Sequence, residues 1–107
     1  MHNKPFQGFA LPVRQGCIDN GVRHNVRQCP IAIAAREFFN PSADRTRNNT
    51  DVWVSTQGRI NLIRGGVDFI FRAEFAQHFV LRYDSGRSVA PQTFYYELER
   101  VVCDAAR

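Results

Sequence analysis

The chain has 107 residues, enough for one hydrophobic core and too few for two domains. Its composition, with 44% hydrophobic and 22% charged residues, is that of a globular protein and argues against a chain that is disordered throughout. The formal charge is +4, and the excess lies in the first half: residues 1–50 hold seven basic and three acidic groups, whereas residues 51–107 hold seven of each.

Membrane insertion and export are not expected from the sequence. The longest apolar stretch, Pro30 to Ala35, is far shorter than the roughly 20 residues that cross a bilayer. The N-terminal residues lack the apolar core of a signal peptide. The cysteines Cys17, Cys29 and Cys103 are odd in number and irregularly spaced, which argues against a disulfide scaffold. We therefore expect a soluble cytoplasmic protein.

The N-terminal part of the chain is predicted to have short elements only. Residues 1–8 are expected to form a loose arm. Phe9 to Val13 is expected to be an edge strand, because Pro12 has no N–H to donate to a neighbouring strand. Gln15 to Asn20 is expected to form a short helical segment, which Gly21 is suited to end.

A longer helix is predicted over about residues 30–39. Pro30 suits the first helical position, and Asn40-Pro41 would end the helix. Apolar residues recur at helical spacing and would form its buried face: Ile31, Ala34, Ala35 and Phe38. Residues 40–50 are almost free of apolar side chains and are predicted to form a mobile loop.

From residue 51 the hydrophobic period changes to two, which indicates strands. An antiparallel meander is predicted over 51–72, with a hairpin turn at Gly65-Gly66. A second long helix is predicted over 73–84 and a further strand near 93–98. The apolar stripe of the helix would be Phe75, Ala76, Phe79, Val80 and Tyr83. One face of the strand would hold Phe94, Tyr96 and Leu98, and the residues after it are ambiguous between strand and helix.

Together these elements predict an α+β fold in a single domain of residues 1–107. A small antiparallel sheet, made of the meander over 51–72 and the strand near 93–98, would be packed by the two helices at about 30–39 and 73–84. No internal repeat or second domain is indicated.

The basic side chains suggest a surface for an anionic partner. All but one of the 14 are arginine, whose planar guanidinium group pairs with phosphates and carboxylates through two hydrogen bonds. The candidates for partner binding are Arg14, Arg23, His24, Arg27, Arg45 and Arg47. Arg23 and Arg27 would lie one turn apart if their segment were helical. The alternatives are a solvated basic face and an arginine content that only reflects a GC-rich coding sequence.

Aromatic side chains on the predicted strands are a second kind of candidate. Trp53, Tyr95 and Tyr96 include residues for the outer face of the sheet, where an aromatic ring would suit a protein interface or a stacked base. Packing in or near the core is the alternative, and it is preferred for Trp53.

Catalytic and metal-binding chemistry is not predicted. Cys29 precedes Pro30 at a helix start, where backbone N–H groups would favour a thiolate, but a buried structural cysteine is the more common outcome. Cys17, His24, Cys29 and Cys103 do not match the spacing of a zinc site. No nucleophile elbow, zinc-protease motif or phosphate-binding loop is present. We therefore expect no catalytic residue, metal or cofactor.

Two segments resemble those of a protein group. Cys29 to Ala34 reads Cys-Pro-Ile-Ala-Ile-Ala, and Asp84 to Pro91 fits the pattern Asp-x-Gly-x-x-Val-x-Pro. With Asp51 to Val54, these segments resemble small uncharacterised proteins of actinobacterial genomes and their phages. The resemblance spans most of residues 11–98 and implies a phage or mobile-element setting, with no established activity.

Three functional hypotheses follow. The leading one is a non-catalytic binding protein of phage or mobile-element type that occludes a host or defence protein complex, as CRISPR inhibitors do. The partner would be a host or defence protein, or a nucleoprotein. The first alternative is a basic accessory protein that binds nucleic acid through Arg14, Arg23, Arg27, Arg45 and Arg47. The second is a small enzyme that depends on Cys29.

Overall fold

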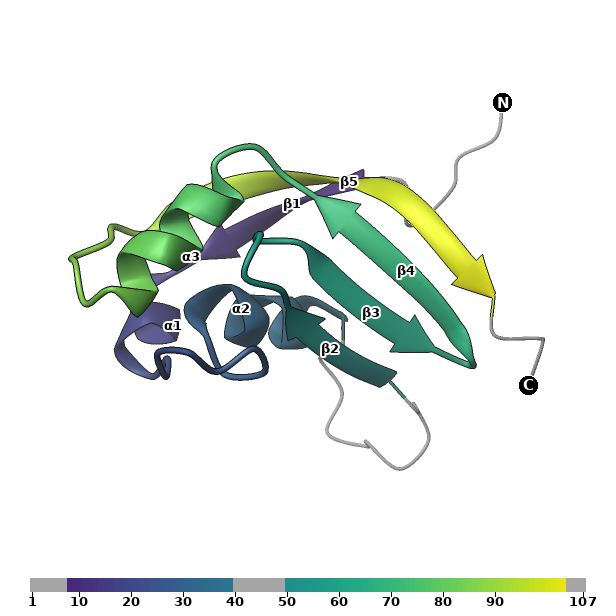
Figure 1. Cartoon of the computed structure of the whole chain (residues 1–107), viewed down its shortest axis with the longest axis horizontal. Helices are drawn as coiled ribbons and strands as arrows, with labels where there is room; N and C mark the ends of the chain where they lie inside the picture. The colour runs from purple at the N-terminus through teal and green to yellow at the C-terminus, as the bar shows by residue number, and fades with distance from the viewer. Residues whose placement is uncertain (1–7, 40–49, 104–107) are drawn as a thin grey trace.

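The computed structural model describes residues 8–39 and 50–103. The elements are β1 (Gly8–Val13), α1 (Gln15–Asp19), α2 (Pro30–Phe39), β2 (Thr50–Val54), β3 (Ile60–Arg64), β4 (Val67–Arg72), α3 (Ala76–Asp84) and β5 (Gln92–Cys103) (Figure 1). This arrangement confirms the predicted α+β fold. None of the described helices is long and apolar enough to span a bilayer.

The strands form one antiparallel sheet in the order β1-β5-β4-β3-β2. The predicted meander is confirmed by the consecutive pairs β2–β3 and β3–β4. Its second hairpin turns at Gly65 and Gly66, whose φ angles of 62° and 80° are accessible to glycine at little cost. The predicted edge position of β1 is also confirmed, because in the described sheet it has β5 as its neighbour on one side only.

The sheet curls around α2. This helix contacts both β1 and β2, which are the two edges of the sheet and would lie far apart if the sheet were flat (Figure 1). The loop before α2 contributes to the closure, since the N–H of Val54 donates to the carbonyl oxygen of Val26 at 2.8 Å. One face of the sheet is therefore wrapped around a helix, and the other face looks outward.

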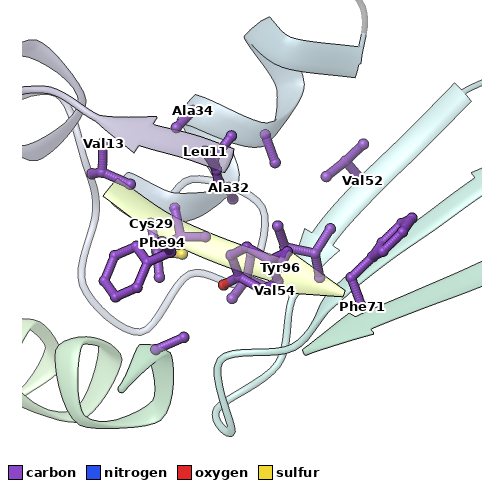
Figure 2. Close-up of a cluster of buried hydrophobic side chains, with 14 of the residues drawn as sticks. Leu11, Val13, Cys29, Ala32, Ala34, Val52, Val54, Phe71, Phe94 and Tyr96 are labelled. Carbon is purple, nitrogen blue, oxygen red and sulfur yellow. The ribbon is translucent and has the colours of Figure 1, made fainter. Parts of the chain in front are cut away.

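The core lies between the inner face of the sheet and the helices (Figure 2). The partly buried Phe9 packs against this core, with ring centroids 5.1 Å from Phe39 and 5.0 Å from Phe71. At the other end, Phe79 of α3 meets Phe94 of β5 edge to face, 5.3 Å between centroids. Rings in such arrangements are stabilised beyond the area that they bury.

Helix α2 has the predicted bounds but a different buried face. Pro30 and Phe39 are its first and last residues. Its alanines at positions 32, 34 and 35 are buried and let the backbone lie close to the sheet. Phe38, predicted to be buried, is 45% exposed, whereas Phe39 is 6% exposed. The prediction was wrong at this end because Phe39, one position on, reaches the ring of the buried Phe71, whereas the described ring contacts of Phe38 are with the partly buried Phe9 and with Phe39 itself.

Two boundaries in the second half differ from prediction. The helix predicted over 73–84 begins at Ala76, because Phe75 has a φ of 67° and cannot be part of a right-handed helix. The strand predicted near 93–98 runs from Gln92 to Cys103. The register with β4 shifts between Ile70 and Phe71, so the strand continues past the point where its alternating pattern breaks.

The predicted arm and loop fall mostly outside the described residues. Of the arm over 1–8, only Gly8 is described, and it belongs to β1. Of the loop over 40–50, only Thr50 is described, and it begins β2. Positions 8 and 50 were therefore wrongly assigned to irregular structure.

Candidate functional site

Two of the predicted partner-binding arginines form ion pairs within the chain. Arg14 Nη2 lies 3.1 Å from Glu37 Oε1, which joins the start of α1 to α2. Arg27 Nη2 lies 2.9 Å from Asp51 Oδ2, and its guanidinium carbon lies 5.4 Å from the centre of the Trp53 ring. Arg45 and Arg47 lie outside the described residues.

Arg23 and His24 also contact the chain itself. Arg23 Nε donates to the carbonyl oxygen of Tyr83 at 3.1 Å, and its guanidinium lies over the Tyr83 ring. The backbone N–H of His24 donates to Asp84 Oδ1 at 2.9 Å. Residues 21–28 form turns rather than a helix, so Arg23 and Arg27 do not share a helical face as considered from the sequence. The described members of the predicted set are therefore engaged in several separate intramolecular contacts.

Cys29 is buried beside the first turn of α2. Backbone N–H groups of Ile31 and Ala32 act to lower the pKa of its thiol, but burial outweighs them and raises that pKa above its ordinary value. A thiol held protonated in this way is a poor nucleophile. Among the residues described by the structure, no three His, Cys, Asp or Glu side chains are grouped as a metal site would require.

Strand β5 has different neighbours along its length. Its first part, Gln92–Glu97, pairs with β1, and its second part, Glu97–Cys103, pairs with β4. Strand β4 ends at Arg72, opposite Glu97, and the chain there turns towards α3. Within the described sheet, residues 92–96 therefore have a strand on one side only.

The orientation of the unpaired backbone groups follows from Pro12. In an antiparallel ladder, pairs that exchange two hydrogen bonds alternate with pairs that exchange none. Pro12 has no N–H, so its pair with Thr93 is of the second kind, and so is the pair of Ala10 with Tyr95 two residues along. The N–H and C=O groups of Thr93 and Tyr95 consequently point away from β1. Outside the strand ladders, no backbone hydrogen bond joins these groups to another described residue.

A cavity of about 490 Å³ lies beside this open edge. One wall is the turn from β4 to α3, and the other is the start of β5. We call this cavity the β5 groove. Its lining residues are Arg72, Ala73, Glu74, Phe75, Gln92, Thr93, Phe94, Tyr95 and Glu97.

Two aromatic side chains of the groove are exposed to solvent. Phe75 and Tyr95 are each 74% exposed, the highest values among the large apolar side chains of the described residues. Phe75 also has a left-handed backbone, with φ 67° and ψ −5°, which costs a bulky residue on the order of 1 kcal/mol or more. The fold therefore keeps Phe75 in an unfavourable conformation and gains little burial from its ring.

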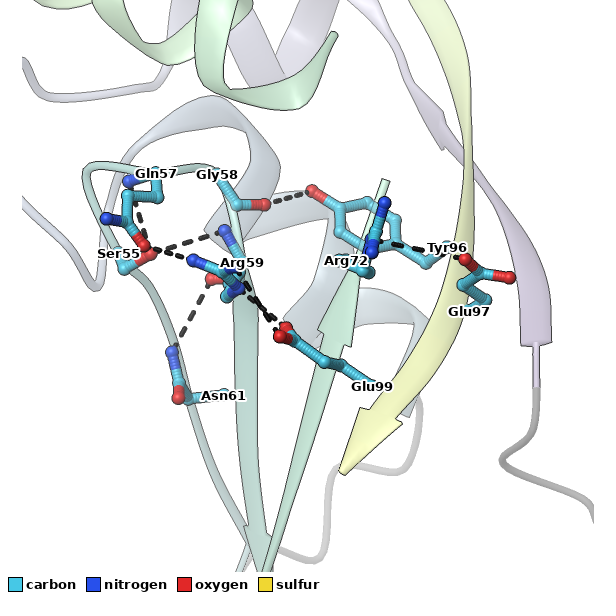
Figure 3. A network of polar contacts seen from close by, with 9 residues as sticks. All are labelled: Ser55, Gln57, Gly58, Arg59, Asn61, Arg72, Tyr96, Glu97 and Glu99. Carbon is cyan, nitrogen blue, oxygen red and sulfur yellow. Dashed lines mark hydrogen bonds and ion pairs between the residues drawn. The ribbon is translucent and has the colours of Figure 1, made fainter. Parts of the chain in front are cut away.

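Gly58 fixes the first turn of α3 next to the groove. With a φ of 79°, it approaches the helix so closely that a Cβ atom would lie 2.6 Å from the backbone of Ala76 and Gln77. The hydroxyl of Tyr96 donates to the carbonyl oxygen of Gly58 at 2.8 Å (Figure 3). Burial raises the pKa of Tyr96, so its hydroxyl stays protonated and remains a donor. Gly58 thus lies between strand β5 and the start of α3 and contacts both, in addition to the direct contact of Phe94 with Phe79.

The rim of the groove is charged. Arg72 Nε and Glu97 Oε2 are 4.0 Å apart, at the limit of an ion pair (Figure 3). Glu99, two residues further along β5, is instead held by Arg59 at 2.6 Å, and this hydrogen bond lowers the pKa of its carboxyl. Glu74 is exposed on the opposite wall. The groove therefore combines an open strand edge, exposed rings and loosely paired charges.

Part of this site could be found from the sequence. Tyr95 lies on the outer face of the sheet, a position that the sequence suggested for it. Its neighbours Phe94 and Tyr96 are buried, so alternation along β5 places Tyr95 on the opposite face. Trp53 is partly buried, as preferred, and Tyr96 belongs to the core. Phe75 was missed, because its position in the apolar stripe predicts a helical residue. Its φ of 67° places it before the helix instead, and no sequence pattern predicts that angle for phenylalanine.

Comparisons with known proteins give no relative: no family model, curated protein or solved structure matches this chain. The resemblance to small proteins of actinobacterial genomes and their phages stays a prediction.

Proposed function

We propose that this chain is a non-catalytic binding protein of phage or mobile-element type that occludes a host or defence protein. The β5 groove would be its docking site, and an extended segment of the partner would lie along the open edge of β5 as an added strand. No metal or cofactor is needed for this function, and the partner would be met in the cytoplasm.

The observation that supports this proposal most is the open edge at Thr93 and Tyr95. These residues direct two N–H and two C=O groups towards the groove. Exposed edges of this kind bind extended peptides, with main-chain hydrogen bonds for affinity and neighbouring pockets for specificity. The open stretch 92–96 would span about 17 Å, which fits a partner strand of about five residues.

The exposed rings support a protein as partner. Phe75 and Tyr95 would lose most of their contact with water if a strand occupied the groove. Buried aromatic residues often dominate the binding energy of protein interfaces. The strain at Phe75 fits the same interpretation, because unfavourable backbone conformations are common where a protein binds.

The alternatives have less support. Binding of nucleic acid through the arginines would compete with the contacts that Arg14 and Arg27 make to carboxylates. An enzyme that depends on Cys29 would need a thiolate, which burial disfavours. The phage setting is supported by the sequence resemblance alone.

Site-specific crosslinking tests the proposal. A photoreactive phenylalanine would be placed at position 95 and, as a matched control, at the exposed position 22 on another surface. Both proteins would be irradiated in host lysate, with and without nuclease. We expect an adduct with a protein at position 95 that survives nuclease and disappears when excess unlabelled wild-type protein is added.

Competition with a proline variant distinguishes strand addition from nonspecific binding to the exposed rings. Excess Tyr95→Pro should not remove the adduct, because proline deletes the N–H that points into the groove without touching the ladder to β1. Thr93→Pro is the second variant of this kind. Equal adducts at positions 22 and 95 would contradict the proposal. Loss of the adduct with nuclease would favour the nucleic-acid alternative.

A further inference from the structure

The groove of this basic chain is locally acidic. The whole sequence has a formal charge of +4, but the groove wall holds the carboxylates of Glu74 and Glu97 against one cation, Arg72. Arg72 and Glu97 are 4.0 Å apart and both largely exposed, so this pair constrains neither side chain strongly. The local excess of one negative charge favours a positively charged ligand at this site.

The exposed rings favour the same kind of ligand. Aromatic faces attract the ammonium group of lysine and, more often, the guanidinium of arginine. Elsewhere in the molecule, Arg23 and Arg27 already lie over Tyr83 and Trp53. In the part of the chain that the structure describes, no cation lies over the ring of Phe75 or Tyr95. These two rings are therefore open to a cation from outside.

The register places the ring of Tyr95 and the carboxylate of Glu97 on one face of the sheet. Thr93, Tyr95 and Glu97 are two residues apart on β5 and project to the same face, opposite to the buried Phe94 and Tyr96. A partner strand beside β5 would direct every second side chain to this face. A side chain opposite Tyr95 would lie next to its ring and within reach of Glu97 on one side and the Phe75 turn on the other.

We infer that the segment bound by the β5 groove has an arginine or lysine at the position opposite Tyr95. Its cationic group lies against the rings of Tyr95 and Phe75 and pairs with Glu97 and Glu74. The carboxylates select the charge, the rings bind the aliphatic part and the cation, and the strand edge sets the register. This inference rests on the proposed function, because it assumes that an extended segment occupies the groove.

Selection from a displayed library of random ten-residue peptides tests the inference. The library would also contain overlapping segments of this chain, so that a second copy is included as a ligand. It would be selected on the wild-type protein, on the charge-reversed Glu74→Lys/Glu97→Lys variant, and on Tyr95→Pro. Tyr95→Phe is the matched control, because it keeps the ring and the backbone N–H. Thermal unfolding of each variant shows whether it is folded.

The expected result is enrichment of peptides with a central arginine or lysine on wild type and on Tyr95→Phe. The charge-reversed variant should lose that preference or select acidic residues instead. One favourable contact between a cation and a ring should make a selected peptide bind roughly fivefold more tightly than the same peptide with glutamine in place of the arginine or lysine. Nuclear magnetic resonance shifts at the Thr93 and Tyr95 amides would locate the peptide.

The results that would contradict the cation preference differ from those that would contradict strand addition. Peptides that depend on the groove but show no preference for a cation would overturn this inference and leave strand addition intact. Peptides that bind Tyr95→Pro and Thr93→Pro as well as wild type would overturn the proposed function. Enrichment of the chain's own segments above the random peptides would assign the groove to a second copy of the chain and overturn both.

Discussion

The arginine-rich surface and the β5 groove differ in how far the fold itself uses their side chains. Arg14, Arg23 and Arg27 all contact acidic side chains, rings or carbonyl oxygens of the same chain. In the groove, Phe75 and Tyr95 are exposed and an edge of β5 is open. The comparison shows that net charge alone does not say which charged side chains are free of contacts, because several arginines already contact their own chain.

The two regions should also differ in how much their residues contribute to the free energy of unfolding. The groove wall depends on close packing at one glycine, whereas the arginines form exposed pairs that each contribute little to folding. Substitutions at the groove scaffold should therefore change the free energy of unfolding most, and substitutions at the arginines least.

Gly58→Ala should have the largest effect. The new Cβ would lie 2.6 Å from the backbone of α3, and the φ of 79° is unfavourable for alanine. We expect a loss of about 3 kcal/mol from strain and clash combined. Gly65→Ala is the matched control: it has a φ of 62° but nothing within 4 Å, and should cost about 1 kcal/mol. Chemical denaturation measures both, and equal losses would show that α3 is not held as described.

Tyr96→Phe should have the next largest effect. It removes the hydroxyl that donates to Gly58 and leaves a carbonyl oxygen without its partner. The expected loss is about 1.5 kcal/mol of unfolding free energy. Tyr95→Phe removes an exposed hydroxyl from the neighbouring residue and should change stability very little. If both variants unfold at the same denaturant concentration as wild type, the Tyr96 contact does not support the groove.

Phe75→Gly should stabilise the protein while weakening capture at the groove. Glycine accepts the φ of 67° freely, so we expect a gain of about 1 kcal/mol in unfolding free energy. Phe75→Ala removes the same ring but keeps the strain, and should give no such gain. Both variants should compete less well for the adduct at position 95. A Phe75→Gly protein that is less stable than Phe75→Ala would contradict the strain at this position.

The arginine variants should have the smallest effects. Arg27→Ala loses an ion pair and a ring contact and should cost about 1 kcal/mol, whereas Arg14→Ala loses one exposed pair and should cost less than about 0.5 kcal/mol. Neither should affect the adduct at position 95. Loss of that adduct in either variant, at unchanged stability, would move the docking site to the arginine surface.

Much of the fold could be predicted because its signals are local. Pro30 and the alanines that follow it predict α2, and Gly65-Gly66 between alternating apolar residues predicts the second hairpin. The end of β5 could not be predicted, because the register shift beside Ile70 breaks the period of two on which the prediction depends. The buried residue at the end of α2 was wrongly predicted because Phe38 and Phe39 are both apolar, and the contact of Phe39 with Phe71 of β4 is distant in sequence.

The candidate site was harder to predict than the fold. The exposure of Tyr95 follows from strand alternation, but an open edge depends on which strands are neighbours and where each one ends. The early end of β4 at Arg72 and the left-handed turn at Phe75 determine the groove, and neither has a sequence signature. The intramolecular contacts of the arginines could not be predicted, because their partners, such as Glu37 and Asp51, are distant in sequence.

Amide hydrogen exchange along β5 of the free protein tests the open edge most directly. The N–H groups of Phe94 and Tyr96 are bonded to β1, and those of Thr93 and Tyr95 point into the groove. We predict slow exchange at 94 and 96 and fast exchange at 93 and 95, since an unbonded amide beside solvent exchanges without local unfolding. Equal protection of all four amides would show that this edge is already occupied and would contradict the account.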